Sequence, residues 1–353
     1  MPKFENNILG LVPQDEWLNM GFRVTRPSDP IDTLFTDDKT NNLMAKWQSI
    51  ASEYQIPVMA QFHGFDTESQ TTFRVPVDTH NIEKGLIKVK INQSERLRAL
   101  TRAGVRNDEM YDYVLNDGIR LADQVVTRTK VAKNELMATG KITIKENNLD
   151  LTVDYGVPQA HTQYTLDFDA DADIPAQIQA IIDDALEIGV TLTGILTSKA
   201  NVTKMRQNGA IQKAIGGNIA AGALVSRSAL DAYLEEEFGI TTVITNDLTY
   251  GASSTIGSDG RPVITTKRYF PKDVVTFFAT NPGGKMGVGL WGNPPEVDNG
   301  QLMEASASGV SPYVYISQWM EKDPAVLWTK ASSLFMPVLY NPNSLFIATV
   351  ENP

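Results

Sequence analysis

The sequence contains no cysteine, only three histidines and no long run of apolar residues. The absence of cysteine excludes disulfides, thiolate zinc sites, iron–sulfur clusters and thiol nucleophiles, and it suits a reducing compartment. No apolar stretch approaches the roughly 20 residues that cross a bilayer, and the polar start lacks the apolar segment of a signal peptide. We therefore expect a soluble protein made in the cytoplasm, with no membrane partner.

Positive charge is also scarce, because 31 Lys and Arg residues face 42 Asp and Glu residues, a formal net charge of −11. Binding to DNA phosphates requires clustered basic side chains in a positive field, so this balance argues against a DNA-binding surface. The 353 residues are 42% hydrophobic, which is an ordinary globular composition. At about 150 residues per domain, this length predicts roughly two domains.

One glycine pattern could indicate a dinucleotide site. Gly287, Gly289 and Gly292 match G-x-G-x-x-G, whose glycines open a helix that holds a pyrophosphate. The Asn-Pro-Pro segment at 293–295 stops such a helix instead of starting it. We therefore interpret these glycines as belonging to a strand and its turns.

Two features of the sequence could indicate a metal site, and each has a simpler structural explanation. The alternating carboxylates from Asp167 to Asp173 resemble the start of a calcium loop, but the sixth-position glycine and the twelfth-position glutamate are missing. We interpret this run as an acidic lead-in to a helix that follows Asp173. His63, His80 and His161 lie in separate segments, which favours surface or ribbon positions. The sequence thus predicts no catalytic, cofactor-binding or metal-binding residue and no cofactor.

The first part of the chain indicates a subunit that is completed by its neighbours. Residues 1–55 have weak periodicity and scattered large apolar residues, which is typical of an arm that lies on another surface. An alternating ribbon then flanks a turn region at 81–85. A lone two-stranded ribbon is marginal in water, so we expect a neighbouring subunit to cover its apolar face.

The basic run at 94–106 is either a solvated face or a surface that pairs with acidic groups on a neighbour. A nucleic-acid role ranks third, because no aromatic residues interleave the run. The expected assembly interface combines ribbon and basic residues, namely Phe73, Val75, Val77, Ile87, Lys88, Val89, Ile91, Arg96, Arg98, Arg102 and Arg106.

A long helix is predicted from Asn107 to Thr139, with apolar residues at three- and four-residue steps and Gly140 at its end. At about 1.5 Å per residue it spans on the order of 50 Å, so we expect it to be a spine for a sheet. A hairpin follows at 141–156.

The remaining sequence predicts an α/β unit and returning strands. Ser198 is expected to cap one helix, and Ser228 with Asp231 has the spacing of a capping box for another. The other expected elements are a helix from Asp173 to Gly189, strands at 190–196, 241–245 and 274–278, a Gly/Ser-rich loop at 251–261, and strands at 326–328 and 344–350.

This order of parts resembles the major capsid proteins of tailed phages with the Hong Kong 97-type fold, most closely the lambda major head protein (phage capsid protein E) family. The matching segments are 134–144 running into 151–156, 196–198 leading to 205–208, 287–295, and the closing 336–338, 341–342 and 346–348. Members of the family vary in the extended hairpin and in the 251–261 loop, so no contact residue carries over there. The resemblance gives no basis for a covalent cross-link.

The resemblance implies an α+β fold with an N-terminal arm at 1–55, an extended loop and its base at 56–106, and a peripheral domain at 107–173 with the spine helix. It further implies an axial domain at 174–320 and C-terminal strands at 321–353 that return to the peripheral domain. The implied protein is the major capsid protein of a tailed double-stranded DNA bacteriophage. It would assemble in the bacterial cytoplasm into hexamers and pentamers of an icosahedral shell.

The implied partners are further copies of the chain, scaffold and portal proteins, a decoration protein in some relatives, and packaged DNA bound without sequence specificity. Two other classes remain open at this stage. One is a soluble α/β enzyme of unknown reaction, and the other is a tail-tube or decoration protein, which the long helix disfavours because those proteins are mostly β.

Overall fold

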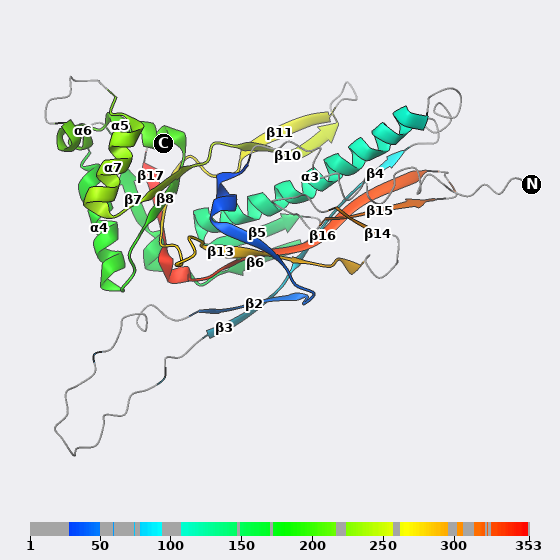
Figure 1. Ribbon diagram of the computed structural model, residues 1–353, viewed down its shortest axis with the longest axis horizontal. Coiled ribbons are helices and arrows are strands. Elements are labelled where there is room, and N and C mark those ends of the chain that lie inside the picture. Colours follow the sequence, from blue (N-terminus) through cyan, green and yellow to red (C-terminus); the bar gives the residue numbers. More distant parts are fainter. Residues whose placement is uncertain are drawn as a thin grey trace, which may run out of the picture.

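The long helix α3 (Asn107–Thr139) lies along a six-stranded sheet and has the bounds expected from the sequence (Figure 1). Gly140 follows it with a φ of 69°, the left-handed conformation of a helix C′ residue. Leu121, Val125 and Leu136 point into the main core with exposed fractions of 3% or less. The expectation of a spine helix on a sheet is confirmed.

The computed structural model describes residues 28–49, 59, 74, 78–93, 107–146, 149–169, 172–216, 224–256, 262–295, 302–305, 314–321, 323 and 326–351.

The six-stranded sheet is organised around one long strand, β16. Its first half pairs with β15 and its second half with β13 along one edge, while β4 pairs along the other edge. All neighbouring pairs are antiparallel except β1 with β13. The strands are β1 (Phe35–Lys39), β4 (Gly85–Gln93), β13 (Gly287–Gly292), β14 (Leu302–Ala305), β15 (Val314–Met320) and β16 (Leu327–Leu339).

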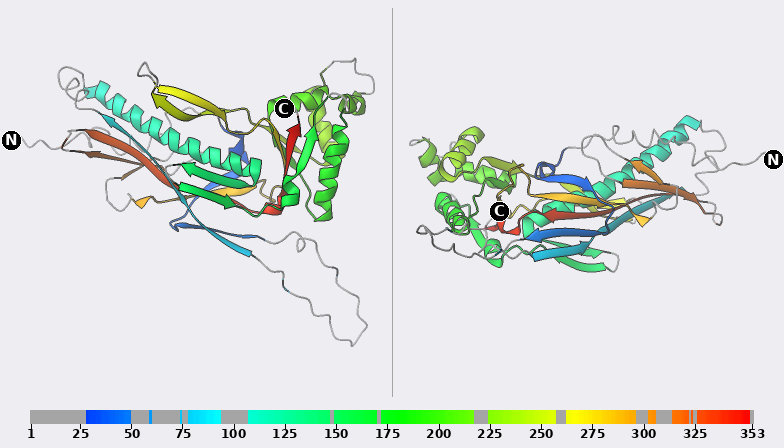
Figure 2. Two further views of the ribbon diagram at one scale, coloured as in Figure 1. Left: turned by 180° about the vertical axis from the view of Figure 1, so that it is seen from behind. Right: turned by 60° about the horizontal axis from the view of Figure 1, so that its bottom comes forward.

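A second sheet of five strands lies at the end of the molecule where the shorter helices gather (Figure 2). One of its faces joins the main core, and the other forms a separate core with the helices. Its order is β7 (Tyr164–Asp167), β17 (Leu345–Glu351), β12 (Val274–Phe278), β8 (Gly194–Thr197) and β9 (Thr242–Thr245), and the helices are α4 (Ile174–Glu187), α5 (Lys199–Gln207), α6 (Gly209–Gly216) and α7 (Arg227–Phe238).

Three two-stranded ribbons complete the described strands. In Figure 1 one of them leaves the body on the side away from α3, and another lies beside α3. Three short 3-10 turns, η2 (Pro30–Thr33), η4 (Gln159–Thr162) and η6 (Pro342–Ser344), connect neighbouring elements. The ribbon that leaves the body is β2 (Met44–Ser49) with β3 (Asp78–Glu83). The ribbon beside α3 is β10 (Thr249–Ile256) with β11 (Pro262–Arg268). The third ribbon is β5 (Lys141–Glu146) with β6 (Leu149–Asp154).

The turn region predicted at 81–85 is wrong, because β3 runs to Glu83 and β4 begins at Gly85. β3 pairs with β2 and β4 pairs with β16, while the first ribbon strand, expected around Phe73, Val75 and Val77, lies outside the described residues. Ile87, Val89 and Ile91 consequently pack against the main core of their own chain. Local alternation identified β4 correctly, but its partner strand lies more than two hundred residues further along the chain.

Three smaller expectations also need correction. The 251–261 segment is not a loop throughout, because β10 continues to Ile256 in an antiparallel ribbon with β11. The strand expected at 190–196 is only β8, which begins at Gly194. Helix α7 is capped by Ser226, whose hydroxyl accepts a hydrogen bond from the Ala229 amide at 3.1 Å, and not by Ser228. The cap of α5, Ser198, was predicted correctly. Asp173, which was expected only as the end of an acidic lead-in, is itself the N-cap of α4.

Candidate functional site

Strand β4 carries the described part of the expected assembly interface, and its two faces differ. Ile87, Val89 and Ile91 face the main core, while Lys88 and Lys90 are exposed on the opposite face. This separation follows from the two-residue period of a strand. The residues of β4 that were expected at an interface are thus divided between two faces: the three apolar side chains pack on the core of their own chain, and Lys88 is exposed beside Lys90.

A buried lysine fixes the start of β4. The Lys84 ammonium donates hydrogen bonds to the carbonyl oxygens of Thr40 at 2.9 Å and Trp291 at 3.0 Å. Burial lowers the pKa of Lys84, and the nearby carboxylate of Asp38 opposes that change. Lys84 thus ties the base of the β2–β3 ribbon to the edge of the large sheet.

The glycine pattern at 287–292 forms β13, an inner strand between β1 and β16. A Cβ atom on Gly289 would collide with the Asp37 carboxylate and would come within 2.9 Å of the Phe335 ring and 3.1 Å of Lys133 Cε. A Cβ atom on Gly287 would collide with the Val338 carbonyl oxygen. These glycines are explained by close packing between strands, as the strand interpretation of the motif predicts.

Beneath α3 lies a compact charged cluster. The Lys133 ammonium is 2.9 Å from the Asp37 carboxylate and 3.5 Å from Asp32, and Lys130 is 3.2 Å from Asp32. Lys133 is only 1% exposed. Two lysines from one turn of α3 therefore anchor η2 and β1 to the helix. Removing any one charged group would leave its partner as a poorly solvated charge.

A buried polar triad joins three distant segments. The Asn246 side-chain amide donates to Asp29 and to the Asn134 carbonyl, both at 2.9 Å, and Asn134 donates to Asp29 at 3.3 Å. Each of the three residues is at most 1% exposed. Burial raises the pKa of the Asp29 carboxyl. The triad connects the N-terminal segment, α3 and the end of β9.

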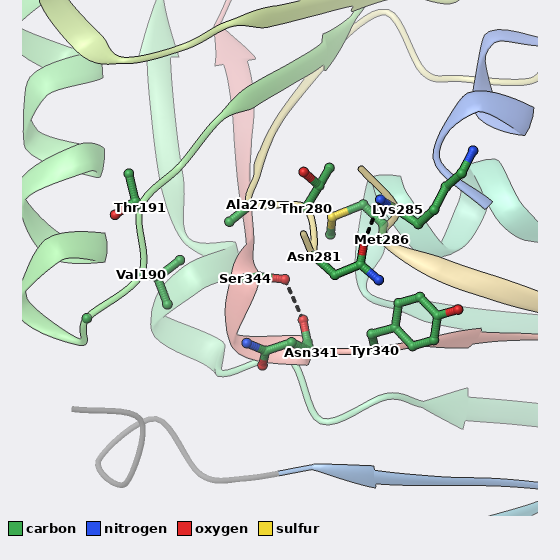
Figure 3. Close-up of a pocket in the computed structure, with 11 residues that line it drawn as sticks. Val190, Thr191, Ala279, Thr280, Asn281, Lys285, Met286, Tyr340, Asn341 and Ser344 are labelled. Atoms are coloured by element: carbon green, nitrogen blue, oxygen red, sulfur yellow. Dashed lines mark hydrogen bonds between the residues drawn. The ribbon is translucent and has the colours of Figure 1, made fainter. Parts of the chain in front are cut away.

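A cavity of about 320 Å³ lies between the two sheets and is shown in Figure 3. The polar groups that line the cavity form hydrogen bonds within tight turns of the backbone. Asn281 accepts a hydrogen bond from the Lys285 amide at 2.9 Å, and the Ser344 hydroxyl donates to the Asn341 carbonyl at 2.7 Å. The Lys285 ammonium donates to the Thr33 carbonyl at 2.7 Å. The lining therefore holds loops in place at the boundary between the two sheets.

The acidic run acts as a helix lead-in, as predicted. Asp173 accepts a hydrogen bond from the Ala176 amide at 3.1 Å at the start of α4, and Asp167 accepts one from the Asp169 amide at 2.9 Å. His161, in contrast, is not a surface residue: it is 6% exposed and stacks on Phe346 with ring centres 4.0 Å apart. Burial lowers the pKa of His161.

Several expected residues lie outside the described part of the chain, namely His63, Phe73, Val75, Val77, Arg96, Arg98, Arg102 and Arg106. Sequence reasoning missed the buried triad and the Lys133 cluster. Asp29 precedes a Pro at the start of a helical turn, which is a capping signal, but nothing local in the sequence predicts its partners on α3 and after β9.

Over the described ranges, no three His, Asp or Glu side chains gather as a metal site. Among those same residues, no helix combines the length and the apolarity that a membrane crossing requires.

Comparison with known families and structures adds independent information. A family profile described as phage major capsid protein E matches residues 56–350. No curated protein matches the sequence. The matched range includes α3 and every described strand from β3 to the last residues of β17.

Solved structures share the fold at low sequence identity. A prophage protein from E. coli CFT073 assigned as a capsid protein is 13% identical, with a TM-score of 0.52 over 98% of each chain. A phage-related protein from Bordetella bronchiseptica RB50 is 8% identical, with a TM-score of 0.51 over 94% of this chain and 95% of that one. A chain from Mycobacterium phage Cain is 10% identical, with a TM-score of 0.50 over 95% and 94% of the two chains. The mixed helix and sheet architecture is therefore one found among phage proteins, and the Hong Kong 97-type arrangement is consistent with these matches.

Proposed function

Because the chain belongs to the phage major capsid protein E family and is a major capsid protein, not an enzyme, we propose that it assembles as hexamers and pentamers into an icosahedral shell around double-stranded DNA. The protein is a component of the virion. The proposal further includes assembly in the bacterial cytoplasm with scaffold and portal proteins and, where the shell requires one, a decoration protein.

The family match over residues 56–350 is the observation that carries this function. The form of the subunit supports it. β2 and β3 pair only with each other among the described strands, and although Ala45 and Trp47 of β2 pack on the main core, the ribbon runs out from the body (Figure 1). A two-stranded ribbon gains stability from a surface that covers it, and a closed symmetric assembly supplies such surfaces.

For the domains, we propose a peripheral domain built on α3 and the six-stranded sheet, and an axial domain built on the five-stranded sheet and α4 to α7. The expected axial range 174–320 spans both sheets, since β13, β14 and β15 lie in the larger one. The expected C-terminal segment 321–353 also contributes to both, through β16 and β17. Residues 30–47 of the expected arm add buried side chains to the main core. The arm is therefore proposed for the residues before Asp29, because Asp29 already belongs to the buried triad.

The extended loop is proposed for the residues between β2 and β3. Ser49 and Asp78 stand directly opposite each other in that ribbon. Replacing residues 50–77 with Asn-Gly would close a two-residue hairpin at this pair without disturbing the register. The shortened subunit should melt cooperatively with the helix content of the parent, yet form few or no closed shells in sedimentation. Normal shells from the shortened protein would contradict the proposed role of the loop.

A further inference from the structure

The exposed face of β4 continues onto β16. Lys90 stands directly opposite Lys330 in the β4–β16 register. Lys88 lies two residues before Lys90 on the same face of the strand. Within the described residues, neither Lys88 nor Lys90 forms an ion pair with a carboxylate. Three lysines therefore share one side of two adjacent strands.

Two tryptophans extend this basic surface. The Lys90 ammonium lies 4.1 Å from the centre of the Trp328 ring, and Trp328 stacks on Trp319 of β15 with ring centres 6.2 Å apart. The indole N–H of Trp328 donates to Glu321 at 2.9 Å, which places one carboxylate at the margin. We call the surface formed by Lys88, Lys90, Lys330, Trp319 and Trp328 the lysine–tryptophan face.

This concentration of positive charge contrasts with the rest of the chain. Like charges directly opposite each other in a sheet are destabilising, so the Lys90–Lys330 pair works against the fold of the isolated subunit. The stretch 84–106 contains seven basic residues and one acidic residue in a chain whose net charge is −11. A surface of this kind suits a partner that carries negative charge and some apolar area.

We propose that the lysine–tryptophan face is a docking surface for an acidic segment of a second copy of this chain in the shell. The inference rests on the proposed function, because shell assembly brings copies of a strongly acidic chain into repeated contact. Carboxylates of the neighbour would pair with the lysines, and its apolar groups would cover the tryptophan rings. Duplex DNA fits less well, since its phosphate backbone offers no apolar groups to cover the tryptophan rings. This proposal differs from the interface expected from the sequence, which included both faces of β4. Here only the lysines of β4 face the neighbour, and its apolar residues pack inside their own chain.

The test uses the full chain carrying Lys88→Gln, Lys90→Gln and Lys330→Gln together. Its matched control carries Lys213→Gln, Lys267→Gln and Lys272→Gln, three exposed lysines elsewhere with the same total charge change. Particle yield is measured by sedimentation under conditions in which the parent assembles, and melting is followed on dissociated subunits. We expect the first variant to melt no lower than the parent, because the opposed Lys90–Lys330 charges are gone, but to give a particle yield lower by about tenfold or more. The control should assemble normally, and a Lys→Arg version of the first variant should recover the yield.

Three results would overturn the inference. Equal yields from the first variant and the parent would show that no copy docks there. Equal losses in variant and control would show that only net charge matters. Normal assembly combined with weaker binding of a short DNA duplex would assign the face to DNA. A parent chain that never assembles, in contrast, would contradict the proposed function itself.

Discussion

Asn246 donates its side-chain amide to the Asp29 carboxylate at 2.9 Å, although the two residues are 217 positions apart in the chain. Asn134 of α3 completes the triad. Asn246 directly follows β9, so the contact holds the five-stranded sheet to the spine helix and to the N-terminal segment. The triad therefore adds fully buried polar contacts to the apolar packing that joins the five-stranded sheet to the main core.

Asn246→Ala should destabilise the dissociated subunit by about 1–3 kcal/mol, because it removes the donor to the buried Asn134 side-chain carbonyl and one of the donors to the Asp29 carboxylate. Urea unfolding monitored by circular dichroism measures the change. Asn81→Ala, at an exposed position of β3, is the control and should be nearly neutral. Equal stability of the two variants would contradict the role given to the triad.

Lys133→Met should cost about 3–5 kcal/mol, because it leaves Asp37 partly buried beside an apolar side chain. Adding Asp37→Leu should recover part of this loss, since both charges are then absent. The free energies of unfolding of the two single variants and the double variant measure the coupling. Additive effects would show that the Lys133–Asp37 contact contributes nothing to stability.

Gly289→Ala should destabilise the subunit by about 1–3 kcal/mol or more, because its Cβ atom would meet Asp37, Phe335 and Lys133. Gly85→Ala is the control in the same sheet, since its Cβ atom would only touch the Phe335 carbonyl oxygen at 3.6 Å. Thermal melting of both variants measures the difference. A stable Gly289→Ala protein would mean that β1 and β13 can separate without loss.

The contrast between these sites shows what sequence reasoning could predict. The bounds of α3, the hairpin that follows it and the Ser198 cap of α5 depend on local periodicity and on a single capping residue, and they were predicted. The pairing of β4 with β16 depends on a contact between distant segments, which alternation alone does not specify. A two-residue period predicts two faces for a strand, but it does not say which face the rest of the chain covers.

The site was harder to predict for the same reason. The local pattern of β4 predicts Lys88, whereas Trp328 and Lys330 join it only because β16 lies beside β4. The basic run at 94–106 has no interleaved aromatic residues in the sequence, yet the fold supplies two tryptophans next to Lys90 of the preceding strand. His161 was assigned to the surface because its stacking partner, Phe346, lies near the other end of the chain.

His161 should make the subunit less stable in mild acid. Its pKa is lowered in the folded state from an ordinary value of about 6.5, chiefly by burial, although the Leu345 carbonyl and Asp184 oppose the change. The unfolded chain therefore binds a proton more readily, so stability is full above about pH 6.5 and falls as the pH drops below it. Urea unfolding between about pH 7 and pH 5 measures this loss, and His161→Phe should reduce its pH dependence. An unchanged slope in that variant would assign the acid sensitivity to other groups.

The central claim is that this chain builds a shell, and electron microscopy of the full-length protein expressed with its scaffold tests it most directly. The account predicts closed particles, or hexamers, pentamers and tubes on the way to them, sedimenting far ahead of a monomer. A chain that stays strictly monomeric with scaffold present, and that turns over a small substrate, would contradict it.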